Sequence, residues 1–169
     1  PPLLALDAEV ELRSQAGTRR LSLGRFILGN RRTALGPQEL LIAIRVPKTS
    51  AEGASAFVKL GARRYLVISI AMAAARIVAG ADGRVARAAI AVGACSPVAV
   101  RLPDLEADLV GRPADGALSD TVAARHVAGL SPIDDVRGTA EYRREAAREI
   151  VARAIRMALE QSGSREMAA

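Results

Sequence analysis

Residues 68–93 read ISIAMAAARIVAGADGRVARAAIAVG, and their pattern predicts the central element of the fold. It contains two apolar runs, 68–79 and 85–93, on either side of the turn sequence GADG. Periodicity alone leaves the first run undecided between a strand and a buried helix. The Gly- and Asp-rich turn between two runs of similar length favours a pair of strands. We therefore predict one long antiparallel hairpin.

The segment before this hairpin also shows the patterns of strands. Apolar and polar side chains alternate over residues 3–12. They alternate again over 39–46, where Leu41 lies opposite the more apolar face formed by the even-numbered residues. Pro47 ends this second strand because proline donates no ladder hydrogen bond. The other elements expected before residue 61 are a hairpin partner at 20–23, a helical turn at 23–27 and a strand at 54–60.

Helical patterns dominate after residue 101. We predict helices at 105–110, 118–128 and 139–161. The last of these has an apolar stripe with the i, i+3, i+4, i+7 spacing of one helix face, formed by Ala147, Ile150, Val151, Ala154, Ile155 and Ala158. Thr139 suits its N-cap and Gly163 its C-terminal end, which leaves 163–169 as a tail. Strands followed by helices indicate an α+β fold.

Composition limits the classes of function. The chain has 169 residues, enough for one domain or slightly more, and a formal net charge of +6. Two Phe, two Tyr and no Trp leave little aromatic surface for base stacking, which argues against nucleic acid as a partner. One Cys and one His exclude a disulfide framework and a zinc site built from this chain alone. The richest apolar stretch, 67–75, is too short to span a membrane. We expect a cytoplasmic protein whose sequence begins within a domain.

The residues alone offer two candidate sites. Lys59 stands out because the chain otherwise favours Arg and has only one other lysine. Its ammonium group suits a point contact to a phosphate or carbonyl oxygen, although the spacing alone favours a solvent-facing strand residue. The loop after it contains Arg63, Arg64 and Tyr65, which suit either an anion site or a solvated basic turn. The sequence contains no phosphate-cradling glycine motif, so it provides no self-contained nucleotide site.

The single His and Cys have structural interpretations. His126 has no Ser, Cys or carboxylate motif near it in the sequence, so we read it as a capping or surface residue and not as a general base. Cys95 ends the second apolar run, where an unpaired cysteine behaves as a small buried hydrophobe.

Four segments together resemble the FAD-binding (medium) subunit of the molybdenum hydroxylases, the family of xanthine dehydrogenase and carbon monoxide dehydrogenase. These segments are PLLALDAEV at 2–10, ELLIAIRVP at 39–47, FVKLGARRYLVIS at 57–69 and AEYRR at 140–144. The resemblance implies that residues 1–60 are the last part of an FAD-binding subdomain. It also implies that residues 65–162 are the family's C-terminal domain, a three-stranded antiparallel sheet packed with helices.

The resemblance further implies a cofactor and partners. Leu41 and Lys59 match family positions that lie against the flavin, and Arg63, Arg64 and Tyr65 become candidates for covering or tuning its ring. Val67 stands where many relatives have an Asp. The FAD would be shared with an N-terminal region, and the molybdenum cofactor and 2Fe-2S clusters would belong to a molybdenum-binding subunit and an iron–sulfur subunit.

Two functions remain open. In the first, the chain passes electrons from iron–sulfur clusters through FAD to NAD or another acceptor. In the second, it is an interaction domain that docks the iron–sulfur or molybdenum subunit without binding FAD by itself. A basic nucleic-acid binder is a third and weaker alternative because the Arg residues are dispersed.

Overall fold

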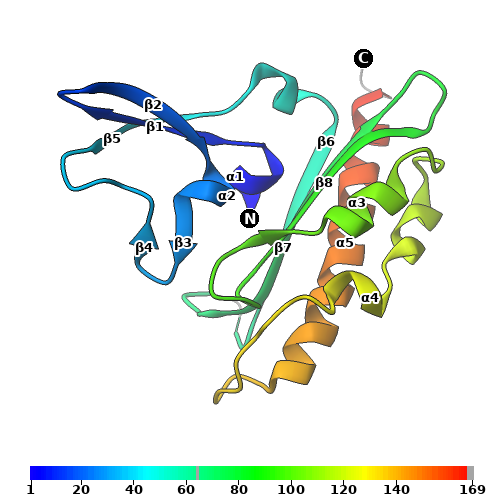
Figure 1. Cartoon of the computed structure of the whole chain (residues 1–169). Helices are drawn as coiled ribbons and strands as arrows, with labels where there is room; N and C mark the ends of the chain where they lie inside the picture. Colours follow the sequence, from blue (N-terminus) through cyan, green and yellow to red (C-terminus); the bar gives the residue numbers. More distant parts are fainter. Residues whose placement is uncertain (64, 167–169) are drawn as a thin grey trace.

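The computed structural model describes residues 1–63 and 65–166, and it forms two antiparallel sheets with helices between and beside them (Figure 1). The first sheet has the strand order β2-β1-β5. The short helix α1 precedes this sheet in the sequence. The helical turn α2 and a two-stranded ribbon, β3-β4, come between β2 and β5. The bounds in this part are α1 Pro2–Ala5, β1 Glu9–Ser14, β2 Gly17–Ser22, α2 Leu23–Phe26, β3 Ile27–Gly29, β4 Arg32–Thr33 and β5 Leu40–Arg45.

The second sheet contains the predicted hairpin. Its strands, in the order β6-β7-β8-β9, are β6 Ala54–Gly61, β7 Ser69–Ala79, β8 Val85–Gly93 and β9 Val100–Arg101. The preference for strands over a buried helix at 68–79 is therefore confirmed. β7, β8 and β9 supply the three strands expected after residue 65, and β6 adds a fourth that pairs with β7 from Ala54↔Ile77 to Gly61↔Ser69. The residues just before the expected boundary at 60 thus belong to the second sheet by their hydrogen bonds.

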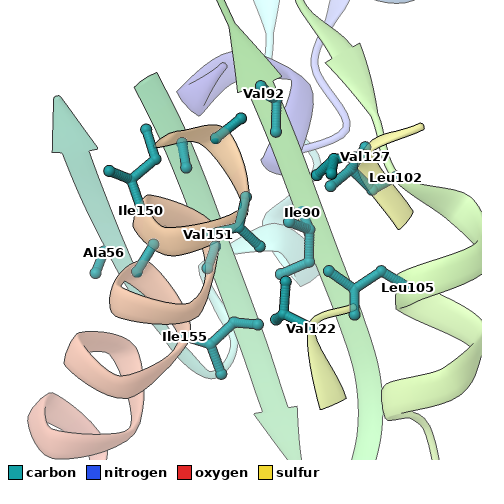
Figure 2. Close-up of a cluster of buried hydrophobic side chains, with 14 of the residues drawn as sticks. Ala56, Ile90, Val92, Leu102, Leu105, Val122, Val127, Ile150, Val151 and Ile155 are labelled. Carbon is teal, nitrogen blue, oxygen red and sulfur yellow. The ribbon is translucent and has the colours of Figure 1, made fainter. Parts of the chain in front are cut away.

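Helices cover one face of the second sheet. They are α3 Pro103–Leu109, the 3-10 turn η2 Gly116–Thr121, α4 Ala124–Val127 and the long helix α5 Ala140–Glu166, and a further 3-10 turn, η1 Lys48–Ala51, links the sheets. The whole predicted stripe of α5 is buried. Figure 2 shows Ile150, Val151 and Ile155 of α5 pointing toward the strands, with Ile90 of β8 in the same cluster. The core is therefore built from small and branched aliphatic side chains, as the composition indicates.

The two faces of the second sheet have different neighbours because side chains alternate along its strands. Ala71, Ala73, Ala75 and Ile77 of β7 pack with α5. Ala74 of β7 and two alanines of β8 pack instead with Ala5 of α1. Figure 1 shows α1 and the first sheet on the side of the second sheet opposite α5. The first sheet is thus attached to the second through α1, and η1 provides the covalent link.

Three sequence expectations are corrected. Residues 3–8 are not a strand: the alternation of Leu4, Leu6 and Ala8 imitates one, but a proline at the first helical position and the bond from Ala5 N to Pro1 O (3.0 Å) form a helical turn. The helix expected at 118–128 is split because Val122 and the following residue have extended backbone. α5 continues through residue 163 to Glu166, because one glycine costs a helix only about 1 kcal/mol relative to alanine.

Candidate functional site

The main cavity of interest is an apolar groove between the first sheet and α1. It has a volume of about 480 Å³ and is lined by Pro1, Pro2, Leu3, Leu4, Val10, Leu23, Gly24, Phe26, Ile27, Leu41, Ile44 and Ala99. These described residues include no charged side chain. Leu41 and Ile44 of β5 are 42% and 51% exposed, so they keep apolar surface available at the groove. Such a groove suits the apolar part of a flat ligand.

A β-bulge brings these two side chains to the groove. The pairing of β1 with β5 shifts between Glu11↔Ala43 and Leu12↔Leu41, so Ile42 has no partner in the register. An extra residue in a strand reverses the alternation beyond it. The sequence pattern places Leu41 and Ile44 on opposite faces of the strand, whereas in the structure both line the same groove. The expected apolar face of β5 is also largely exposed, with Leu40 at 71%.

Lys59 and the loop after it form a second, separate group at the end of β6. The Lys59 ammonium donates a hydrogen bond to the Val67 carbonyl oxygen at 2.8 Å. The Arg63 guanidinium donates to the Leu66 carbonyl oxygen at 2.6 Å. Leu66 is 94% exposed and has φ +48°, a backbone conformation that is unusual for a bulky residue. The two basic side chains therefore hold a loop whose tip presents an apolar side chain to solvent.

The structure separates the predicted site residues into these two groups. Leu41 lines the groove, whereas Lys59, Arg63 and Tyr65 do not. Arg64 lies outside the described residues. Tyr65 is exposed, at 68%. The roles of these residues toward a flavin remain predictions.

A buried arginine fixes the far end of the same loop. Arg143 of α5 donates to the Ile70 carbonyl oxygen at 2.9 Å and to Asp135 Oδ1 at 2.6 Å. The backbone N–H of Arg137 is the main cause that lowers the pKa of the Asp135 carboxyl, with the Arg143 guanidinium adding to it. The carboxylate stays ionised beside the arginine, and the start of β7 is thereby tied to α5.

Neither His126 nor Cys95 has the surroundings of a reactive group. His126 Nδ1 accepts from the Ala123 backbone N–H at 3.0 Å, and its Nε2 lies 3.0 Å from Asp108 Oδ2, so both ring nitrogens are used. The capping interpretation of His126 is confirmed, whereas the surface alternative is wrong because the side chain is fully buried. Cys95 is fully buried, and desolvation raises the pKa of its thiol. The described residues contain no cluster of three His, Cys, Asp or Glu side chains that suits a metal ion.

Sequence reasoning missed a third group of functional interest, the ion pairs of Asp7 with Arg76 and Arg101. Arg76 is the one charge inside the apolar run 68–79, and a buried charge requires a partner. That signal was visible in the sequence, although its partner was not. Within the described part of the chain, no helix is both long and apolar enough to cross a membrane.

Comparison with known protein families gives two matches that together cover most of the chain. Residues 56–158 match the model of the CO dehydrogenase flavoprotein C-terminal domain. Residues 1–49 match the FAD binding domain in molybdopterin dehydrogenase. The two matches are separated by residues 50–55, a segment that runs from η1 into the first residues of β6.

Individual proteins show the same relationship. The chain is 33% identical over 161 residues to the 6-hydroxypseudooxynicotine dehydrogenase complex subunit alpha of Paenarthrobacter nicotinovorans, a match that covers 93% of this chain and 53% of that protein. It is 30% identical to the carbon monoxide dehydrogenase medium chain of Afipia carboxidovorans, with 90% and 52% covered.

A solved structure, reconstituted CO dehydrogenase from Oligotropha carboxidovorans, superimposes with a TM-score of 0.83 at 29% identity, covering 94% of this chain and 55% of that one. The chain thus spans about half the length of the relatives it matches. Because the C-terminal domain model covers most of its residues, the chain belongs to the CO dehydrogenase flavoprotein family, the FAD-binding medium subunits of the molybdenum hydroxylases.

Proposed function

We propose that this chain forms one side of the FAD site in a cytoplasmic molybdenum hydroxylase complex. In that complex it would help pass electrons from the 2Fe-2S clusters of an iron–sulfur subunit through FAD to NAD or another acceptor. The observation that carries the proposal is the apolar groove containing Leu41, because all of its lining residues except Ala99 lie in the segment that matches an FAD-binding domain. The redox chemistry is that of bound FAD, and the protein contributes placement and electrostatics.

The groove fits one part of the cofactor and not the other. Its aliphatic and aromatic lining suits the dimethylbenzene edge of an isoalloxazine ring. A pyrophosphate needs backbone N–H donors or basic side chains, and the described lining residues supply no basic side chain. We therefore propose that this chain packs against the ring, with Leu41 in contact, while a preceding region of the flavoprotein holds the phosphates.

Lys59 is proposed to contact a polar atom of the flavin. Its ammonium has three N–H donors, and the Val67 carbonyl uses one of them. That bond orients the side chain and leaves donor capacity for a ring oxygen or nitrogen. Arg63, Arg64 and Tyr65 are proposed to control access to the ring, since they belong to the loop that Lys59 holds.

We also keep as a proposal that the chain has two units, the end of an FAD-binding subdomain and a C-terminal domain. The expected bounds are 1–60 and 65–162. The pairing of β6 with β7 favours a division near η1, because it assigns 54–61 to the second unit.

A second candidate function is docking of the partner subunits that carry iron–sulfur clusters and molybdenum. Apolar side chains are exposed in two segments, the loop between β6 and β7 and the segment before α5. They are Leu66 and Ile68 in the first and Ile133 and Val136 in the second, with Val136 fully exposed. Arg143 hydrogen-bonds next to both segments and holds them together. Exposed apolar patches of this kind favour a protein interface.

The test of the first function uses the two lysines of the chain. The wild-type chain is combined with the N-terminal half of a related flavoprotein and FAD, separated by gel filtration, and its visible flavin absorbance is measured. Lys59→Ala should lose retained flavin, whereas Lys48→Ala, which removes the same charge from exposed η1, should not. Equal retention in both variants would remove Lys59 from the site. A colourless mixture that still binds an iron–sulfur subunit would favour the docking function.

A further inference from the structure

The turn after α1 holds a strained aspartate between two arginines from the second sheet. Asp7 has φ +51°, in the left-handed region that Asp tolerates better than most residues. Its Oδ2 accepts from Arg76 at 2.6 Å, and its Oδ1 accepts from Arg101 at 2.7 Å. Strained backbone persists only where the surroundings determine it. Here two charged hydrogen bonds from different strands do so.

The same two arginines also bind the backbone of α1. Arg76 Nε donates to the Ala5 carbonyl oxygen at 2.8 Å, and Arg101 donates to the Leu4 carbonyl oxygen at 3.0 Å. These carbonyls lie at the C-terminal end of the helix, a position that favours cations, and the Leu4 carbonyl also accepts from the Asp7 backbone N–H at 3.1 Å. Each guanidinium therefore contacts both the carboxylate and a carbonyl of one turn, a geometry that a planar group with several fixed donors allows.

Both arginines are themselves held in place. The Arg76 side chain is 7% exposed, in the middle of β7. Arg101 pairs with both oxygens of Glu106, at 2.5 and 2.9 Å, and Glu106 in turn accepts from the Ile90 backbone N–H at 2.8 Å. The donors are thus part of the rigid second sheet and its helix α3.

The apolar contact at this junction cannot set an orientation by itself. Ala5 and the partly buried Leu4 meet Ala74, Ala89 and Ala91, whose methyl groups form a smooth surface on the sheet with little interlocking shape. Directional, charge-assisted hydrogen bonds supply the geometric specificity that such a surface lacks. We propose that Asp7, Arg76 and Arg101 form a clamp that fixes the orientation of the first sheet relative to the second.

The clamp has a consequence that rests on the proposed function. Leu41 belongs to the first sheet and Lys59 to the second, so their relative placement depends on the junction at α1. Asp7, Arg76 and Arg101 are then positioning residues for the flavin, acting through the two sheets without touching the cofactor.

The clamp is tested by distances between the two sheets, measured without flavin. Spin labels are attached through Ala16→Cys at the tip of the β1–β2 hairpin and Ala81→Cys at the tip of the β7–β8 hairpin, both exposed, with the buried Cys95 replaced by Ala. Double electron–electron resonance then gives the distance distribution. The unaltered clamp should give one narrow distribution. Asp7→Asn, which keeps the left-handed turn but removes the charge, should broaden and shift it.

Matched variants keep the test decisive. Glu145→Gln removes a carboxylate from an exposed ion pair with Arg148 within α5, and it should leave the distribution unchanged. Should Asp7→Asn fail to fold, Arg101→Gln provides the same readout, because Arg101 is more exposed than Arg76. A narrow, unshifted distribution in a folded clamp variant would overturn the proposal. A broadened distribution with normal flavin retention in the reconstituted pair would keep the clamp and reject its link to the flavin.

Discussion

Gly61→Ala gives a direct test of the loop that holds Lys59. A Cβ added at Gly61 lies 2.4 Å from Val67 Cγ1 and 3.3 Å from Val67 Cγ2. The valine side chain must retreat by about 1 Å to reach ordinary contact, and its β-branched χ1 leaves few rotamers in which to do so. Because the Val67 carbonyl accepts from Lys59, this displacement also disturbs the Lys59 ammonium group.

The magnitude follows from two opposing effects. Overpacking of this kind costs about 1–3 kcal/mol. Replacing Gly by Ala lowers the conformational entropy of the unfolded chain, which stabilises the folded state by about 0.4–1 kcal/mol. We therefore expect Gly61→Ala to lower the free energy of unfolding by about 1–2 kcal/mol, which corresponds to a decrease in Tm of roughly 2–8 °C for a chain of this size.

A double-mutant cycle isolates the predicted clash. Val67→Ala removes both Cγ atoms, so in the double variant the Cβ of Ala at position 61 meets no obstacle from this side chain. Urea unfolding of the four proteins should give a coupling free energy of about 1–2 kcal/mol, with the double variant more stable than the sum of the single effects predicts. Gly116→Ala is the matched control, because nothing lies within 4 Å of its added Cβ. A Gly61→Ala variant as stable as wild type, or a coupling energy near zero, would refute the loop geometry.

Three further outcomes follow from the packing, capping and charges. Ile155→Ala removes a fully buried side chain from the core and should cost about 2–4 kcal/mol in urea unfolding, whereas Met157→Ala, at 37% exposure on the same helix, should cost far less. Thr139→Ala loses the cap bond that the Tyr142 backbone N–H donates to Thr139 Oγ1 (3.1 Å) and should cost about 1 kcal/mol of stability, with Thr139→Ser restoring most of it. The Arg19 guanidinium lowers the pKa of Glu39 to about 2, so the stability that ionised Glu39 contributes is present above its unfolded pKa of 4.5 and is lost as pH falls toward 2. The free energies of unfolding of wild type and Glu39→Gln, measured from pH 7 to pH 2, should converge at the acid end. A difference that stays constant across that range would contradict the Arg19–Glu39 ion pair.

The sequence predicted the elements whose signals are local. The turn between 68–79 and 85–93 identified the long hairpin, and the stripe on α5 identified its buried face before any packing partner was known. Thr139 is the N-cap of α5 for the same reason: its hydroxyl and the N–H it binds are three residues apart. Turn chemistry, helix periodicity and capping all act within one element, so one sequence is enough to reveal them.

Features that depend on distant residues were not predicted. The alternation at 3–8 fits a strand. Besides the proline that starts the turn, α1 is held by the alanine face of the second sheet and by the arginines at 76 and 101, which are distant in the sequence. The bulge at Ile42 depends on the pairing of β1 with β5 and moves Leu41 to the groove. Arg76 was visible as an isolated charge, but its partner Asp7 lies 69 residues away. Leu41 and Lys59 were proposed as flavin contacts from resemblance alone, and their flavin contacts remain to be tested.

We propose that this chain completes an FAD site whose phosphate-binding part is elsewhere in the flavoprotein. The most direct measurement is co-expression of the chain with the N-terminal half of a carbon monoxide dehydrogenase medium chain, followed by gel filtration with visible absorbance. We predict flavin absorbance that elutes with the assembled pair and with neither half alone. A pair that assembles but stays colourless in the presence of added FAD would contradict the claim.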